Sequence, residues 1–251
     1  MVARWFDAPG NRMVTGAPRE RWGCPQIWYD MGTAPEEARY WRPVAVVFDC
    51  DGLLVDTEPC WTVAETELFA RRGLSFGPEQ KAMLIGRTIP AACADLTVLF
   101  DEPGRAPALE AELLGLVSDV LASSAQAMPG AHDVVAAAAA RVPVAVASNS
   151  PRSLLDAALR RAGLVFPVSL CADDVIHAKP APDMYLAACA RLGVPARRCV
   201  AFEDSMTGLR SALAAGVPCV GVPSLPHVEL PADLVLASLR DPFLIDWIRS
   251  W

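Results

Sequence analysis

Residues 43–58 read PVAVVFDCDGLLVDTE, and this stretch decides the fold of the chain. Its first half, Val44 to Phe48, is an unbroken apolar run without helical periodicity, which is typical of a strand buried on both faces of a parallel sheet. Asp49 and Asp51 follow at a spacing of two, so an extended backbone directs both carboxylates to the same side. Gly52 then allows a sharp turn. Because open parallel sheets bind ligands at the carboxyl ends of their strands, this pair marks a candidate site.

The composition of the 251 residues excludes several classes of protein. Apolar residues make up 53%, which excludes general disorder. A net charge of −7 argues against nucleic acid or an anionic membrane surface as the main partner. No apolar run reaches membrane-spanning length, since Arg141 interrupts the longest one, residues 134–147. The eight cysteines form no CxxC pair, so we interpret them as small buried hydrophobes in a reducing cytoplasm.

Three parts of the chain differ in pattern. Residues 1–42 hold four of the seven tryptophans without clear periodicity, and we expect a poorly ordered extension; the alternative is a tail packed onto the body through its tryptophans. Residues 59–127 are helix-like, with expected helices at 58–72, 78–84, 89–100 and 106–127. From residue 128 onward, expected strands alternate with helices, which predicts a parallel sheet covered on both faces. The expected strands are 142–147, 168–171, 199–202, 219–222 and 234–236.

Polar residues follow three of these later strands. Ser148 and Asn149 come just before a helix expected near Pro151, and they form either a phosphate cradle or an ordinary N-cap. Lys179 stands beside two prolines, Pro180 and Pro182, in a stiff, non-helical segment, and it either aims its ammonium at a phosphate or faces solvent. Glu203 and Asp204, followed by Ser205, form either a metal site or a helix N-cap.

Taken together, the four strand-end segments resemble the motifs of the haloacid dehalogenase superfamily of phosphatases, in that family's order. FDCDGLLVDTE is similar to the first motif, ASNS to the second, KPAPDMY to the third and FEDSMTG to the fourth. The β-phosphoglucomutase-like subgroup places a small helical cap between the first two motifs. The resemblance implies an α/β fold: a Rossmann-like parallel-sheet core (43–58 and 128–251), an inserted α-helical cap domain (59–127) and an N-terminal extension (1–42).

The resemblance also implies roles for individual residues. Asp49 would be the nucleophile and Asp51 the general acid and base, in hydrolysis of a small phosphorylated metabolite through an aspartyl-phosphate. The family's phosphate-binding residues would be Ser148, Asn149 and Lys179. Mg²⁺ would be held by Asp49, the carbonyl of Asp51, Asp204 and Glu203. We expect a cytoplasmic, monomeric enzyme with no nucleic-acid or membrane partner.

Several activities within the superfamily compete. Dehalogenases lack the second Asp, so Asp51 argues against them, and the context of Lys81 gives no support for a phosphonatase. Sequences resembling β-phosphoglucomutase carry a His and an Arg where this chain has Trp61 and Ile89. Arg87, directly after Gly86, follows the Gly-Arg-Thr pattern of the phosphatases and is a candidate substrate ligand; the alternative is a surface arginine. A sugar phosphomutase remains the second hypothesis and a catalytically silent phospho-ligand binding protein the third.

Overall fold

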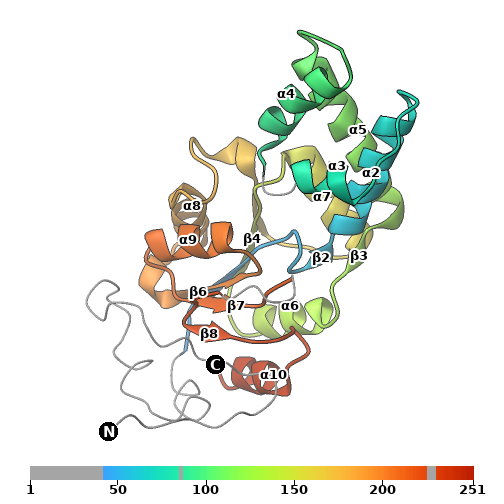
Figure 1. Ribbon diagram of the computed structural model, residues 1–251. Coiled ribbons are helices and arrows are strands. Elements are labelled where there is room, and N and C mark those ends of the chain that lie inside the picture. The colour runs from blue at the N-terminus through green and yellow to red at the C-terminus, as the bar shows by residue number, and fades with distance from the viewer. Residues whose placement is uncertain (1–41, 85–86, 225–229) are drawn as a thin grey trace, which may run out of the picture.

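The computed structural model describes residues 42–84, 87–224 and 230–251, and its centre is a six-stranded sheet in the order β5–β4–β1–β6–β7–β8 (Figure 1). All neighbouring strands are parallel. The central strand pairs on one side through Val46 with Val144 and on the other through Val46 with Val200. The carboxyl ends of β1, β4 and β6 are therefore neighbours. The strands are β1 (Ala45–Phe48), β4 (Val144–Ala147), β5 (Val168–Leu170), β6 (Cys199–Glu203), β7 (Cys219–Gly221) and β8 (Leu234–Val235).

Strand β1 is apolar throughout because both of its faces are covered. Val46 and Phe48 belong to one buried cluster, and Ala45 and Val47 belong to a second cluster on the opposite face. Phe48 also stacks on Phe202 of the neighbouring strand with ring centroids 5.1 Å apart. Burial of each large apolar side chain contributes about 1.5–3 kcal/mol, so this strand is firmly anchored.

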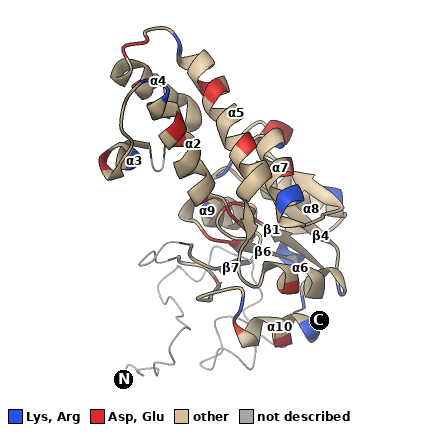
Figure 2. Ribbon diagram, turned by 90° about the vertical axis from the view of Figure 1, so that its right-hand side faces the viewer, with Lys and Arg blue, Asp and Glu red and all other residues tan. Residues whose placement is uncertain are grey.

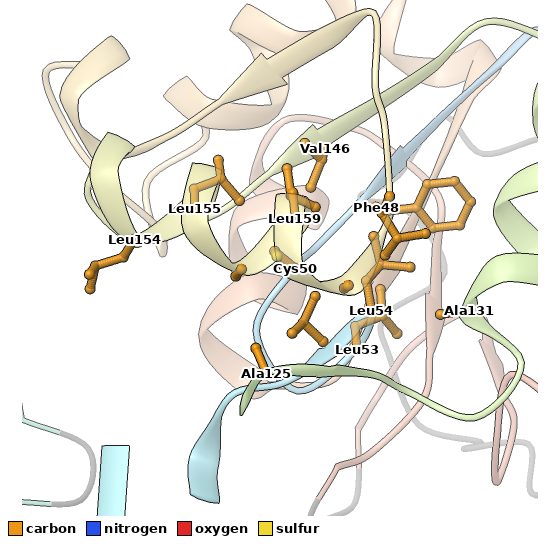
Figure 3. Close-up of a cluster of buried hydrophobic side chains, with 14 of the residues drawn as sticks. Phe48, Cys50, Leu53, Leu54, Ala125, Ala131, Val146, Leu154, Leu155 and Leu159 are labelled. Carbon is orange, nitrogen blue, oxygen red and sulfur yellow. The ribbon is translucent and has the colours of Figure 1, made fainter. Parts of the chain in front are cut away.

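The helices divide between the two faces of the sheet. Helices α6, α7 and α10 contribute to the cluster around Phe48, and α8 and α9 contribute to the cluster on the other face. Figure 3 shows Phe48 gathered with Leu54, Val146, Leu155 and Leu159. The helices are α6 (Ala131–Ala139), α7 (Arg152–Ala162), α8 (Asp183–Leu192), α9 (Met206–Ala214) and α10 (Pro242–Arg249), with short 3-10 turns η2 (Ala172–Asp174) and η3 (Ala196–Arg198). The predicted α/β fold is confirmed.

Four further helices, which we call the inserted helices (residues 58–124), interrupt this alternation. Figure 1 shows them gathered beyond β2, apart from the sheet. They have an aromatic centre of their own, in which Phe69 packs edge-on against Phe76 and Phe100. Their boundaries are α2 (Glu58–Ala70), α3 (Pro78–Leu84), α4 (Ile89–Leu99) and α5 (Ala106–Ser124). The division of the chain into domains stays a prediction.

A small antiparallel ladder joins the inserted helices to the sheet, and the sequence did not reveal it. Strands β2 (Val55–Asp56) and β3 (Gln126–Ala127) pair through Val55 and Ala127. The helix expected over 106–127 is therefore wrong at its end: α5 stops at Ser124, and Ala125 is extended with ψ of 138°. The cross-strand partner overrides the helical propensity of the alanines.

Other expectations concern strand ends and the first residues. The strand expected over 142–147 begins later, at Val144. The expected extension lies almost wholly outside the described residues, as do Ile85 and Gly86 of the Gly-Arg-Thr segment. None of the helices in the described ranges is long and apolar enough to cross a membrane.

Candidate active site

The ends of three neighbouring strands and one loop bring the sequence-predicted residues together. Asp49 follows β1, Ser148 follows β4, and Glu203 and Asp204 end or follow β6. Lys179 reaches the same place from the loop that precedes α8. All five of these residues are buried. We call Asp49, Asp51, Lys179, Glu203 and Asp204 the strand-end cluster.

Lys179 is the centre of this cluster. Its Nζ donates to Asp49 Oδ1 at 2.5 Å, to Glu203 Oε1 at 2.7 Å and to the carbonyl oxygen of Ala147 at 2.8 Å. An ammonium group has three protons, so its capacity as a donor is filled. The alternative of a solvent-exposed lysine is wrong, because only 3% of this side chain is exposed.

Asp51 is held by two hydroxyl groups from the loop after β4. Ser148 Oγ donates to Asp51 Oδ2 at 2.7 Å, and Ser150 Oγ donates to the same oxygen at 3.0 Å. Within the described ranges Oδ1 of Asp51 accepts no hydrogen bond, so it remains available to a ligand. The N-cap alternative for Ser148 and Asn149 is wrong, since the cap residue of α7 is Pro151 and the first N–H of that helix, from Arg152, donates to Asp173 Oδ2 at 2.8 Å.

Asn149 has a different task in the structure from the one expected of it. Its Oδ1 accepts from the backbone N–H of Lys179 at 2.8 Å, and its Nδ2 donates to the carbonyl oxygen of Lys179 at 3.0 Å. The amide thus fixes the loop that carries the lysine. Its side chain is fully used in this way, and a role in phosphate binding stays a prediction that would rest on its backbone N–H.

Sequence reasoning missed three residues that position the strand-end cluster. The first is Ser150, described above, which repeats the hydroxyl of Ser148 two residues later. Tyr185, buried on α8, donates through its hydroxyl to Glu203 Oε1. Ser224, three residues beyond β7, donates to Asp204 Oδ2 at 2.6 Å. Only Tyr185 had a signal in the sequence, since it is the last residue of the KPAPDMY motif.

The capping of α9 leaves the two acidic residues before it free for other contacts. Ser205 is the N-cap, and its Oγ accepts from the N–H of Gly208 at 3.2 Å. Gly208 itself lies against the carboxylate of Glu203, so closely that any side chain at that position would overlap it. The capping hypothesis therefore holds for Ser205, and Glu203 and Asp204 belong to the strand-end cluster.

Burial and crowding shift the pKa values of this cluster. Burial raises the pKa of Asp49 to about 8; the Lys179 ammonium opposes this, and the like charges of Glu203 and Asp51 add to it. Burial, followed by the charge of Asp49, raises the pKa of Asp204 to about 7, and the Ser224 hydroxyl opposes it. Burial also raises the pKa of Glu203. Burial alone would lower the pKa of Lys179, but the two adjacent carboxylates raise it above its ordinary value. One ammonium does not balance these carboxylates.

The same residues fit a divalent cation. One oxygen from each of Asp49, Glu203 and Asp204 lies within 4.8 Å of the others. Oε2 of Glu203 is buried and has no hydrogen-bond partner among the described residues. Gly52, with φ of +80°, is so close to Asp204 Oδ2 that a Cβ would overlap it. An all-oxygen, anionic donor set is the kind that hard divalent cations prefer.

Two basic side chains of the inserted helices lie outside this site. Arg87 forms an ion pair with Asp95 of α4, and within the described ranges it has no hydrogen bond or ion pair with the strand-end cluster. Its role in substrate binding stays a prediction. Lys81 pairs with Glu58 and Glu65, each at 2.8 Å, so it is not the free amine that a Schiff base needs.

Comparisons with known proteins agree with this geometry. The family model for haloacid dehalogenase-like hydrolases matches residues 44–216. Fructose-1-phosphate phosphatase YqaB of Escherichia coli K12 is 35% identical over 188 residues, which cover 73% of this chain and 98% of that protein. A probable pseudouridine-5'-phosphatase of Drosophila melanogaster is 34% identical over 214 residues, 78% of this chain and 89% of that one.

A solved structure gives the same result for the fold. The crystal structure of CbbY from Rhodobacter sphaeroides in complex with phosphate superposes with a TM-score of 0.70 at 28% identity, covering 81% of this chain and 99% of that chain. Hydrolases of this family generally use a divalent metal, for which the acidic group above offers a site. The chain belongs to the haloacid dehalogenase-like hydrolases and is a phosphoric monoester hydrolase.

Proposed function

We propose that this hydrolase removes the phosphate group of a small phosphorylated metabolite through an aspartyl-phosphate on Asp49. One observation carries the proposal: the Lys179 ammonium holds Oδ1 of a buried Asp49 at the end of the central strand, 2.5 Å away. This contact orients the carboxylate and offsets its charge as an anionic phosphate approaches. The names of two relatives, phosphatases of fructose 1-phosphate and pseudouridine 5'-phosphate, support a small monoester as substrate.

In the first step, Oδ2 of Asp49 attacks phosphorus, and the bond from phosphorus to the leaving oxygen breaks. Asp51 donates its proton to that oxygen, so the product leaves as a neutral alcohol. The hydroxyls of Ser148 and Ser150 hold one oxygen of Asp51 and leave the other for this proton transfer. Phosphoryl transfer depends mainly on positioning and charge neutralisation, which these contacts supply.

In the second step, water attacks the phosphorus of the aspartyl-phosphate. Asp51, now ionised, accepts the proton of that water, and the bond from phosphorus to Asp49 breaks to release inorganic phosphate. In this proposal Ser148, Asn149 and Lys179 bind the phosphate oxygens in both steps. Asn149 would do so through its backbone N–H, and Ser148 and Lys179 would each redirect one of the hydrogen bonds described above to the substrate. In this proposal the inserted helices act as a cap domain (59–127) that shields the reaction from bulk water.

The metal in this proposal is Mg²⁺. Asp49, Asp204 and the carbonyl of Asp51 would hold it, with Glu203 as a further ligand or as a neighbour that holds Lys179. When bound, it would neutralise negative charge on the phosphate and the carboxylates. The unpartnered oxygen of Glu203 and the close approach of Gly52 to Asp204 Oδ2, where no side chain fits between them, support this assignment.

The test is release of inorganic phosphate from p-nitrophenyl phosphate and from a panel of phosphorylated metabolites. We expect turnover that depends on Mg²⁺ and is abolished by EDTA. Absence of phosphate release from every ester, with metal and a folded protein present, would contradict the proposal and favour a silent binding protein.

A sugar phosphomutase is the second candidate, because it would share the whole strand-end cluster. Trp61 and Ile89 stand where the resemblance to β-phosphoglucomutase requires a His and an Arg, and this favours a phosphatase. Stoichiometric conversion of β-glucose 1-phosphate to glucose 6-phosphate without free phosphate would reverse the choice. The expected monomeric state, cytoplasmic location and absence of nucleic-acid or membrane partners also stay predictions.

A further inference from the structure

Every basic side chain of the inserted helices is already paired with a carboxylate. Residues 58–124 contain five Lys and Arg residues and ten Asp and Glu residues, so this part of the chain has a net charge of −5. In Figure 2 the acidic residues recur along α5. The pairs are Arg71 with Glu67 and Glu112, Arg72 with Glu102 and Glu112, Lys81 with Glu58 and Glu65, Arg87 with Asp95, and Arg105 with Glu102.

Two of these cations, Arg72 and Lys81, are largely buried within the inserted helices. The Arg72 side chain is 13% exposed, pairs at 2.8 Å with Glu102 and Glu112, and lies 4.7 Å from the ring of Phe100. The Lys81 side chain is 17% exposed between two carboxylates. Moving Lys81 to a substrate would leave the buried carboxylate of Glu65 without an ion-pair partner, which is costly for a group shielded from water. Moving Arg72 would break two ion pairs and its contact with Phe100.

Among the described residues, the loops after β1, β4, β5 and β6 add no unpaired cation near the strand-end cluster; Arg240 has no ion pair within the described ranges, but it follows β8, the edge strand three positions from β1. The loops after β1 and β6 contain no Lys or Arg. After β4, Arg152 pairs with Asp156 and Asp174. After β5, His177 lies 3.1 Å from Asp183, and Lys179 belongs to the strand-end cluster. The lysine can serve the reacting phosphate, but these four loops hold no unpaired cation for a second anionic group.

We infer that the substrate carries one phosphate on an otherwise uncharged molecule, as sugar and polyol monophosphates do, and that bisphosphates and phosphorylated carboxylic acids are discriminated against. This rests on the proposed function, in which the inserted helices face the substrate. Recognition of a second phosphate or a carboxylate normally uses an Arg or Lys in direct contact. Here that group would meet paired cations and a net negative surface, and the repulsion acts over roughly 10 Å at 0.1 M salt.

Two matched pairs of esters test the inference through kcat/KM. Fructose 1-phosphate is compared with fructose 1,6-bisphosphate, and glycerol 3-phosphate with 3-phosphoglycerate. We expect the singly phosphorylated, otherwise uncharged ester of each pair to be preferred by about tenfold or more, since each 1.4 kcal/mol of repulsion or missing contact is a factor of ten. The preference should shrink as ionic strength rises.

A variant then separates charge pairing from total charge. Asp95→Asn frees Arg87 of its carboxylate and should raise the relative kcat/KM for the bisphosphate several-fold. Asp119→Asn is the matched control, because Asp119 is exposed on α5 and its carboxylate has no ion pair within the described ranges. An equal rise in both variants would contradict the role of the Arg87 pair.

Two outcomes separate this inference from the proposed function. Efficient hydrolysis with no preference, or with a preference for the more highly charged esters, would overturn the inference alone. Failure to hydrolyse any of the four esters or p-nitrophenyl phosphate would overturn both.

Discussion

The strand-end cluster and the inserted helices both bring carboxylates and cations into contact, but they balance charge in different ways. At the strand ends, one buried lysine faces Asp49 and Glu203, and Asp51 and Asp204 add further negative charge. In the inserted helices every cation pairs with at least one carboxylate, and pairs such as Arg71–Glu67 are about half exposed. In the strand-end cluster the pKa values of Asp49, Glu203 and Asp204 are raised, and three carboxylates are close enough to hold a cation. The ion pairs of the inserted helices add little stability, and their cations are not free to bind an anionic substrate.

The largest effect, on turnover, is expected from Asp49→Asn in the strand-end cluster. An amide has nearly the shape of the carboxylate but cannot form an acyl phosphate, so turnover should fall by about 10³-fold or more while the protein stays folded. Phosphate release and thermal melting measure the two quantities. Asp133→Asn, an exposed position on α6, is the control and should keep full activity. A tenth of wild-type turnover in Asp49→Asn would remove this residue from the nucleophile role.

The second prediction compares one cation from each region. Lys179→Met leaves Asp49 and Glu203 buried without their ammonium and should lower the free energy of unfolding by about 3–5 kcal/mol. Arg71→Met breaks only the ion pairs of a solvent-exposed arginine, and the expected loss is much smaller. Urea denaturation without metal measures both. Equal losses would show that the two kinds of charge balance do not differ in stability.

A smaller effect, on Mg²⁺ binding, is expected from loss of the Ser224 hydroxyl, which contacts the strand-end cluster at Asp204. Ser224→Ala removes the donor to Asp204 Oδ2, and a hydrogen bond to a charged group contributes about 1.5–3 kcal/mol at most, less where water can replace it. Calorimetric titration with Mg²⁺ should show about three- to tenfold weaker binding. Ser224→Thr keeps the hydroxyl and should bind as the wild type does. Unchanged affinity in the alanine variant would show that Asp204 does not depend on this contact.

The smallest effect is expected outside both regions. Deletion of residues 1–40 should leave activity unchanged and shift the melting temperature by less than about 2 °C, because less than 1 kcal/mol of stability is expected to depend on them. A loss of several degrees would favour the alternative in which their tryptophans pack onto the body.

The central sheet and the acidic residues at its edge were predictable from the sequence because their signals are local. An apolar run such as Val44 to Phe48 has one explanation when two aspartates and a glycine follow it. The ladder of β2 and β3 was missed, since a strand of two residues has no periodicity. Its stability comes from a partner far along the chain, and Ala125 gives no local sign of the change from helix to strand.

The contacts that complete the site were harder to predict from the sequence, because they join segments that are distant along the chain. The hydroxyl of Ser224 reaches Asp204 across 20 residues, and the amide of Asn149 reaches the backbone of Lys179 across 30. Ser and Asn are common turn and cap residues, so neither position is distinctive by type. The pairing of Arg87 with Asp95 was likewise hidden, because ion pairs between exposed residues leave no pattern in the sequence.

The measurement that tests the account most directly is capture of the phosphorylated enzyme. Wild-type protein is mixed with Mg²⁺ and a phosphate ester that it hydrolyses, quenched in acid within the first turnover and digested at low pH, and peptide fragmentation then locates the added phosphoryl group. We expect a phosphoryl group on Asp49, which disappears when turnover is allowed to finish and is absent from Asp49→Asn. Accumulation of the group on another residue, such as Ser148, would contradict the assignment of the nucleophile.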